Sequence, residues 1–322
     1  MSHERTQQGK RTHEEETAAG SSCQAGGMHE DLFKKGEEIL AMRENMARIK
    51  NVVVVLSGKG GVGKSTVAVN LATALTLEGY KVGLLDVDFH GPTVPTMLGL
   101  VGKTALQAEN EKISPVMTQW GLKTISLAYF LRDQDEAVIW RGPMKTGVIK
   151  QLLREVHWGD LDYLLLDCPP GTGDEVLSIA QLVEGSRGAV VVTAPQEVSL
   201  AAVRKSVTFC KSLKLPMLGI VENMSGYLCP HCHKVSNPVG NNAAAELAQK
   251  ERIPFLGSLP ILPDISSSGD QGSPIALQED SQAGKLFKGI AKALVSKMPG
   301  WGSGGEKKVQ DDPPEAVDGA SQ

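Results

Sequence analysis

The sequence has no run that approaches the roughly 18 consecutive apolar residues of a membrane-spanning helix, and its start lacks the apolar core of a secretory signal. Cysteine is scarce as well. Five cysteines, an odd number in 322 residues, fit free, redox-active or metal-ligating thiols in a reducing compartment better than a disulfide framework. These absences predict a cytoplasmic protein without a membrane partner.

An excess of positive charge is also missing. The 33 Lys and Arg residues are outnumbered by 37 Asp and Glu residues, which gives a formal net charge of −4. A protein that binds nucleic acid through its phosphates needs a basic surface, and the overall charge gives no sign of one. We therefore expect no nucleic-acid partner.

The composition is otherwise ordinary for a globular protein, with 41% hydrophobic and 22% charged residues. Segments typical of strands and helices alternate from Asn51 to Lys297 without a Pro- or Ser-rich linker. The ends differ, because residues 1–30 are polar and residues 301–322 are Gly-rich and acidic. We predict a single domain over residues 31–300 between two disordered tails.

The most informative motif is the phosphate-binding pattern GxxxxGK[ST], which lies between an apolar segment, Val52–Leu56, and a helical pattern, Val67–Leu77. Glycines let successive backbone N–H groups close around phosphate oxygens, and the N-terminus of the following helix faces the same anion. Lys64 then supplies positive charge and Ser65 a magnesium ligand. The predicted nucleotide-binding residues of this loop are Gly58, Lys59, Gly60, Gly61, Val62, Gly63, Lys64, Ser65 and Thr66.

Apolar segments typical of buried strands alternate with segments that have helical spacing. The predicted strands are Val52–Leu56, Val82–Leu85, Leu122–Leu127, Tyr163–Leu166, Ala189–Thr193, Met217–Glu222 and Pro254–Gly257. The predicted helices are Leu32–Ile49, Val67–Leu77, Pro143–Val156, Glu175–Val183, Ser199–Lys214, Asn241–Lys250 and Gly284–Ser296. This order predicts an α/β fold of the P-loop NTPase type, with a mostly parallel sheet and helices on both faces.

Two carboxylates follow predicted strands, at the edge where open parallel sheets place their ligands. Asp167 opens the segment DCPPGTGD and suits an outer ligand of Mg²⁺, because a buried carboxylate needs a metal or water to satisfy it. Asp88, in the segment DVDFHGPT, suits the positioning or deprotonation of an attacking water. The alternative is that either aspartate caps a following helix.

Cys229 and Cys232 form a CxxC pair after the strand predicted to end near Glu222. A stable iron–sulfur or zinc site usually needs four ligands, and no second CxxC occurs in the sequence. A twofold dimer would supply a Cys₄ set. Structural zinc in the same dimer and a thioredoxin-type redox pair remain alternatives. Cys168 and Cys210 are predicted to be buried apolar residues.

Taken together, the Lys59-bearing loop and the two aspartate segments resemble the deviant Walker A ATPases, the class of MinD, ParA and the nitrogenase iron protein. With the later segment ENMSG, residues 222–226, they are similar to the Mrp/ApbC family of iron–sulfur cluster carriers over roughly residues 49–298. The resemblance implies that Lys59 reaches the partner's phosphates in an ATP-bound homodimer and contributes to catalysis with Lys64 and Asp88. It also implies that Asn223 and Pro260 hold the adenine.

For the cysteine pair, the resemblance implies a [4Fe-4S] cluster that bridges two subunits through Cys229 and Cys232 of each. Cys23 stands alone, so an N-terminal cluster site of eukaryotic relatives is not transferred. The function we predict is an ATP-hydrolysing homodimer that assembles a labile cluster, with scaffold proteins and apo-protein clients as partners. The alternative is a regulatory or positioning ATPase like MinD or ParA, with structural zinc at the CxxC.

Overall fold

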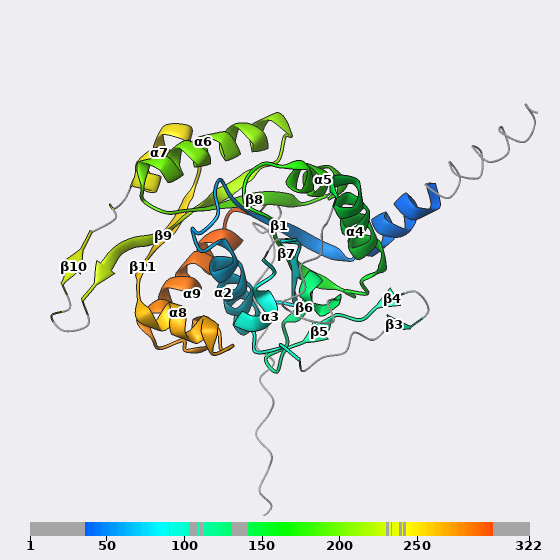
Figure 1. Cartoon of the computed structure of the whole chain (residues 1–322), viewed down its shortest axis with the longest axis horizontal. Helices are drawn as coiled ribbons and strands as arrows, with labels where there is room; N and C mark the ends of the chain where they lie inside the picture. Colours follow the sequence, from blue (N-terminus) through cyan, green and yellow to red (C-terminus); the bar gives the residue numbers. More distant parts are fainter. Residues whose placement is uncertain are drawn as a thin grey trace, which may run out of the picture.

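The computed structural model describes residues 36–89, 91–102, 108–109, 112–130, 141–183, 185–229, 232, 234–237, 240 and 243–298. The predicted tails, residues 1–30 and 301–322, lie outside the described residues, as does Cys23. The described part forms one large sheet flanked by helices, with a separate two-stranded sheet beside it (Figure 1). None of its helices combines the length and the apolar character needed to cross a membrane.

The main sheet has the strand order β9-β8-β1-β7-β2-β6-β5, and β11 and β10 also pair with β9. Only β5 and β10 run antiparallel to their neighbours. The parallel strands are β1 (Ile49–Ser57), β2 (Val82–Asp86), β6 (Lys123–Ser126), β7 (Leu161–Asp167), β8 (Arg187–Thr193), β9 (Met217–Leu228) and β11 (Phe255–Ile261). The antiparallel strands are β5 (Val116–Met117) and β10 (Val235–Ser236), and β3 (Ala108–Glu109) pairs separately with β4 (Lys112–Ile113).

The central strand β1 is buried because its apolar side chains alternate between two cores. Val52, Val54 and Leu56 pack in one core, and Val53 and Val55 pack in the other. Such an unbroken apolar run is expected of a parallel strand covered on both faces. The predicted fold class is therefore confirmed, and β1 becomes a rigid base for the loop that follows it.

The helices divide between the two faces of the sheet (Figure 1). The first core is covered by helical residues 36–46, α4 (Gly142–Glu155), α5 (Asp174–Leu182), α6 (Glu197–Ser212) and α7 (Ala243–Glu251). The second core is covered by α2 (Lys64–Leu77), α3 (Val94–Met97), α8 (Pro263–Asp270) and α9 (Gln282–Val295). Two short 3₁₀ helices, η1 (Leu127–Phe130) and η2 (Ile275–Leu277), complete the described elements.

Several features differ from the sequence-based predictions. The short strands β3, β4, β5 and β10 were not predicted, and β11 continues to Ile261, beyond its predicted end at Gly257. Ile49 opens β1 instead of closing the first helix, because its side chain is buried in register with β7. The short helices α3 and α8 were not predicted. The predicted end of β9 at Glu222 is wrong, because the strand continues to Leu228. Its apolar pattern is broken by polar residues and by left-handed backbone at Met224 (φ 59°) and Gly226 (φ 80°), which hid the extension.

Candidate functional site

The loop between β1 and α2 is shaped by glycines in left-handed backbone conformations. Gly61 has φ 77° and Gly63, the residue before α2, has φ 79°, both of which strain any other residue. The chain thus turns sharply from the buried strand into the helix, and the N-terminus of α2 faces the loop. This backbone is the anion cradle that the motif predicts.

Asn223 of β9 supports the same loop from the side. Its Nδ2 donates to the backbone oxygen of Val62 over 3.0 Å, and the side chain is buried. A Cβ on Gly63 would lie 2.2 Å from that Nδ2, so only glycine fits here. Leu259 of β11 pairs with Asn223, which brings the adjacent Pro260 to the same part of the sheet. Both predicted adenine contacts therefore lie near the loop, and their role stays a prediction.

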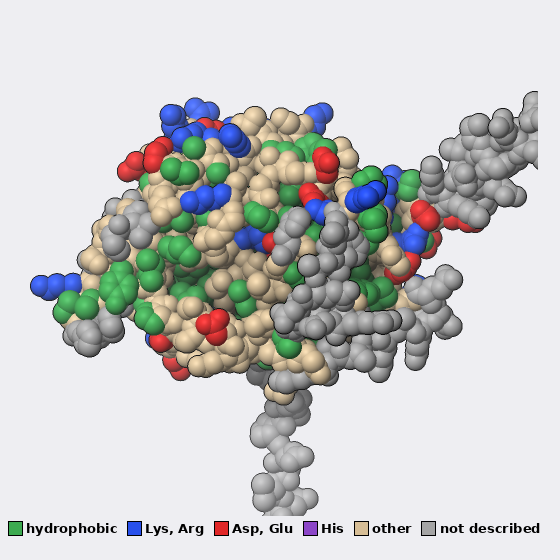
Figure 2. All heavy atoms as spheres, in the orientation of Figure 1, with side chains coloured by type: hydrophobic (Ala, Val, Ile, Leu, Met, Phe, Trp, Pro, Cys, Tyr) green, Lys and Arg blue, Asp and Glu red, His purple; other side chains and the backbone are tan. Residues whose placement is uncertain are grey.

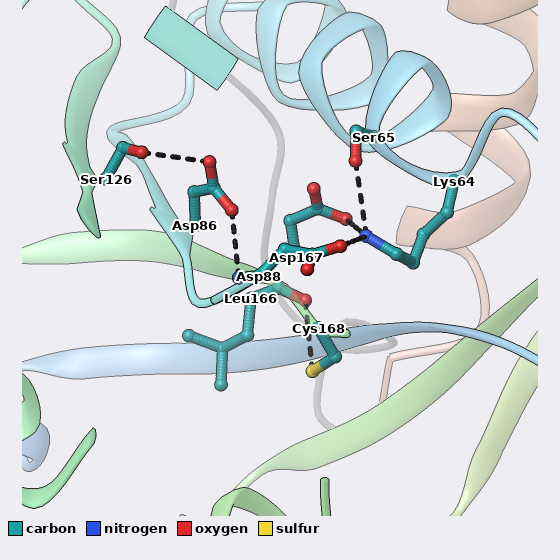
Figure 3. A network of polar contacts seen from close by, with 8 residues as sticks. All are labelled: Lys64, Ser65, Asp86, Asp88, Ser126, Leu166, Asp167 and Cys168. Carbon is teal, nitrogen blue, oxygen red and sulfur yellow. Dashed lines mark hydrogen bonds and ion pairs between the residues drawn. The ribbon is translucent and has the colours of Figure 1, made fainter. Parts of the chain in front are cut away.

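Lys64 is the buried cation of the site, and its Nζ lies 2.6 Å from Asp167 Oδ1 and 3.8 Å from Asp88 Oδ2 (Figure 3). It also donates to Ser65 Oγ over 3.2 Å. Burial opposes the charged ammonium, but the carboxylates outweigh it, and the pKa of Lys64 is raised above its usual value. The lysine thus remains charged and is held by carboxylates at the place where phosphates would bind.

Asp167 ends β7 with both carboxylate oxygens removed from solvent. Oδ1 accepts from Lys64, whereas Oδ2 is buried and accepts no hydrogen bond from the described residues. Burial raises the pKa of Asp167 in spite of the neighbouring Lys64 charge. An ionised carboxylate that is poorly solvated on one oxygen fits a magnesium site with Ser65, because a divalent cation or its water would satisfy that oxygen.

Asp86 is a further buried acid in the site. It lies opposite Asp167 in the β2–β7 register and opposite Ser126 in the β2–β6 register. Its Oδ2 accepts from Ser126 Oγ over 2.9 Å, and its Oδ1 accepts from the backbone N–H of Asp88 over 3.1 Å (Figure 3). Burial and the neighbouring Asp167 raise the pKa of Asp86 to about 8. Asp86 therefore anchors the backbone of Asp88.

The helix-capping alternative for the two predicted aspartates is wrong. Thr93 precedes α3 and Gly173 precedes α5 at the capping positions. Asp88 and Asp167 instead both face Lys64, because their strands end at the same edge of the sheet. That arrangement leaves both carboxylates available for chemistry at the loop.

Lys59 lies on the outer part of the loop, in contrast to the buried Lys64. Its Nζ donates to Gln196 Oε1 over 3.0 Å in a solvent-exposed hydrogen bond, just before α6. An exposed hydrogen bond of this kind stabilises the side chain only weakly, so Lys59 can turn outward at little energetic cost. The predicted role of Lys59 in a partner subunit stays a prediction.

Cys229 and Cys232 are not brought to the loop but lie in the turn between β9 and β10. The backbone N–H of Cys229 donates to the oxygen of Lys234 over 3.1 Å, and Tyr227 pairs with Ser236. Figure 1 shows the two strands projecting from one side of the sheet. Cys229 is half-buried and Cys232 is exposed. The pair thus lies in a turn that follows a strand, and not at the N-terminus of a helix, where the thioredoxin-type alternative places its first cysteine.

The two remaining described cysteines, Cys168 and Cys210, are fully buried, as predicted. The Sγ of Cys168 donates weakly to the oxygen of Leu166 over 3.7 Å. Burial holds the pKa of both thiols well above the usual value, to about 12 for Cys210. Both thiols are therefore protonated and contribute to packing. Among the cysteines that the structure describes, Cys229 and Cys232 are the candidates for thiolate chemistry.

Sequence reasoning missed Asp86, Ser126 and Lys145. Asp86 stands in the same segment as Asp88 and could have been found there, whereas Ser126 joins it only through sheet register. Lys145 Nζ of α4 lies 2.7 Å from Glu175 Oε1 and 5.7 Å from the ring centroid of Phe89. It therefore ties the segment after Asp88 to the start of α5, a link that no sequence pattern reveals.

A mostly parallel sheet with this glycine loop, lysine and strand-end carboxylates defines a P-loop NTPase of the MinD/ParA type. The chain belongs to the ParA family described as NUBPL iron-transfer P-loop NTPases, whose model matches residues 48–295. The predicted resemblance to iron–sulfur carrier ATPases is thus confirmed.

Curated relatives point to the same group. An iron-sulfur cluster carrier protein of Methanocaldococcus jannaschii is 49% identical over 259 residues, covering 80% of this chain and 89% of the relative. A cytosolic Fe-S cluster assembly factor Nubp2 homolog of Drosophila grimshawi is 46% identical and covers 77% of this chain and 95% of its own.

Solved structures agree on the fold. A nucleotide-binding protein from Archaeoglobus fulgidus in complex with ADP has a TM-score of 0.65 and 40% identity, covering 73% of this chain and 91% of that one. The cell division ATPase MinD of Pyrococcus furiosus has a TM-score of 0.58 and 26% identity, and the match covers 77% of this chain and 99% of that one.

Proposed function

We propose that this protein is an ATP-hydrolysing carrier of iron–sulfur clusters that acts in the cytoplasm. As a homodimer it binds a labile [4Fe-4S] cluster between the two copies of Cys229 and Cys232, and it passes the cluster from scaffold proteins to apo-protein clients. The observation that carries the proposal is the combination of a buried Lys64 in a phosphate loop with a half-buried and an exposed thiol, Cys229 and Cys232, in the turn that follows strand β9.

The nucleotide part rests on the ion pairs of Lys64. Asp167 and Asp88 neutralise this buried ammonium. The phosphates of ATP would replace them as its partners, because they carry more negative charge and also meet the N–H groups of the loop. Asp167 and Ser65 would then hold Mg²⁺, and Asp88 would orient the attacking water. The magnesium ion would neutralise charge on the phosphates.

The catalytic contribution of Lys59 requires a second subunit. Its amino group donates to Gln196 in a solvent-exposed hydrogen bond. Turned toward a partner across a twofold axis, it would add positive charge at the partner's transferring phosphoryl group. ATP binding would therefore favour the closed dimer, and hydrolysis would loosen it.

The carrier part rests on the number and the exposure of the thiols. The described part of the chain contains no cluster of three or more His, Cys, Asp or Glu residues that could hold a metal ion by itself. Two chains related by a twofold axis supply four cysteines, the number that a [4Fe-4S] cluster requires. A cluster held between subunits at an exposed turn is accessible to an acceptor protein, which suits a transient cargo. The names of the curated relatives support this assignment.

The test is anaerobic reconstitution with iron and sulfide, followed by absorption spectroscopy and transfer to an apo-protein. The loaded protein should show a broad absorption band at about 400 nm. Cys229→Ser and Cys232→Ser should lose this band while they still bind Mg-ATP. The exposed Ser236→Ala, in the same hairpin, is the matched control and should load normally. A band that survives both cysteine substitutions contradicts the assignment.

A further inference from the structure

Glu222 is a fully buried carboxylate whose oxygens bind the two ends of the cysteine-bearing segment. One oxygen accepts from the hydroxyl of Ser225, where the segment leaves the body of the sheet. The other accepts from the backbone N–H of Ala244 over 2.7 Å, where the segment returns as α7. Cys229 and Cys232 lie in sequence between these two contacts, which one side chain holds together.

The segment that Glu222 closes begins with an irregular stretch of β9. Asn223 pairs with Leu259 of β11, but the next pairing joins Tyr227 to Ile261, so β9 carries extra residues between the two. Met224 within this stretch has φ 59°, a left-handed conformation that is strained for a side chain of this kind. The bond between Glu222 and Ser225 spans this bulge and fixes the direction in which the hairpin leaves the sheet.

Glu222 is also adjacent in sequence to the residue that contacts the phosphate loop. Asn223 Nδ2 donates to the oxygen of Val62, and a change in the loop on nucleotide binding would act directly on Asn223. Because consecutive residues of a strand move together, a shift of Asn223 displaces Glu222 and with it both ends of the hairpin segment. The contacts of the loop and of the hairpin are therefore linked through two neighbouring residues of β9.

We infer that Glu222 is a positioning residue that transmits the nucleotide state of the loop to the cysteine pair, through Asn223 on one side and Ser225 and Ala244 on the other. The inference rests on the proposed function for the identity of the ligands. It concerns the coupling between the two sites, which neither the family model nor the names of the relatives assign.

The experiment measures the alkylation rate of Cys229 and Cys232 by iodoacetamide in the full-length, reduced, metal-free protein, with and without a non-hydrolysable ATP analogue and Mg²⁺. Mass spectrometry follows the peptide that carries both thiols, so Cys23 and the buried Cys168 and Cys210 do not interfere. In the wild type the analogue should change the rate about fivefold or more, the lower end of usual coupling between two sites.

Glu222→Ala should keep the affinity for the analogue and reduce its effect on the thiols to less than about twofold, because the coupling free energy is lost. Glu222→Gln should restore most of the wild-type response, because its amide oxygen can accept from the Ala244 N–H while its amide nitrogen donates to the Ser225 hydroxyl. Glu246→Ala, an exposed acid on α7, is the control and should respond like the wild type. A role in packing alone would lower stability equally in both states and leave the nucleotide effect unchanged.

Any of four results would overturn the inference. One is a Glu222→Ala protein that retains the full nucleotide effect, and another is a wild type that binds the analogue without any change in thiol reactivity. A wild type that binds the analogue without a change in thiol reactivity leaves the proposed function standing. A wild type that does not bind the analogue in calorimetry overturns both the inference and the proposed function. If Glu222→Ala unfolds, Ser225→Ala should still at least roughly halve the effect, and an unchanged effect contradicts the coupling.

Discussion

Lys64 Nζ lies 2.6 Å from Asp167 Oδ1, in an ion pair whose side chains are only 6% and 1% exposed. Removing one partner from such a pair leaves an uncompensated buried charge. The ion pair therefore holds Lys64 in place, and a more strongly charged anion could replace Asp167 as its partner. In the proposed function, nucleotide binding at this loop would exchange a carboxylate for phosphates around the Lys64 ammonium group.

Lys64→Ala should abolish most of the affinity for Mg-ATP. It withdraws the buried cation from the phosphates, a loss on the order of 2–5 kcal/mol in binding free energy. Titration calorimetry measures the change, with the exposed Lys292→Ala as control. Unchanged binding by Lys64→Ala would refute the role of the loop.

Lys59→Ala should behave differently from Lys64→Ala, because the Lys59 amino group is held by an exposed hydrogen bond to Gln196. We expect Mg-ATP affinity within severalfold of wild type, and turnover lowered by at least about tenfold, with the roughly 10³ to 10⁵ of an arginine finger as the upper scale. Gln196→Ala removes the same hydrogen bond and keeps the cation, so its turnover should stay near wild type. Equal loss of binding in Lys59→Ala and Lys64→Ala would contradict this division of roles.

Asp88→Asn should still bind ATP but hydrolyse it slowly, by about 10²- to 10⁴-fold if the carboxylate orients or deprotonates the water. The substitution keeps the backbone N–H that donates to Asp86, so the local chain should retain its position. Single-turnover rates with saturating enzyme separate this effect from binding. An undiminished rate would leave Asp88 with a structural role only.

The free energy of unfolding of Asp86→Asn, measured relative to wild type, should increase as the pH rises. Burial raises the pKa of Asp86 to about 8, so the folded state keeps a proton that the unfolded chain releases near pH 4. Between these values the folded state binds more protons, and wild-type stability falls by up to about 1.4 kcal/mol per pH unit.

Denaturant titrations from about pH 5 to 8 measure the difference between wild type and Asp86→Asn. The gap between the two curves should widen with pH, whereas the exposed Asp280→Asn should follow the wild type. A gap that stays constant over this range would show that Asp86 ionises in the folded protein as it does in the unfolded chain.

The fold and the phosphate loop could be predicted from sequence because their signals are local. The apolar run of β1, the glycines and the helical pattern of α2 are contiguous, and the strand-loop-helix order follows from them. Asp88 and Asp167 could also be selected, because carboxylates after apolar strands meet at one edge of a parallel sheet. Their catalytic and metal roles stay predictions.

What the sequence could not reveal depends on contacts between distant segments. Ser126 reaches Asp86 only because β6 and β2 pair in a particular register. The full length of β9 was missed because its second half is held by pairing with β10 and β11, not by an apolar pattern. Glu222 closes the hairpin segment through Ala244, whose N–H becomes a neighbour only after the chain has folded.

The central claim, that two chains share one cluster, is tested most directly by counting iron, sulfide and zinc in the purified dimer after anaerobic reconstitution. One Cys229–Cys232 pair per chain and four thiolates per cluster predict about four iron and four sulfide per dimer, hence about two of each per chain. Loading should also shift the equilibrium toward the dimer, since the ligand binds only the assembled state. A dimer that holds one zinc ion and takes up neither iron nor sulfide would contradict the carrier account and favour a regulatory ATPase.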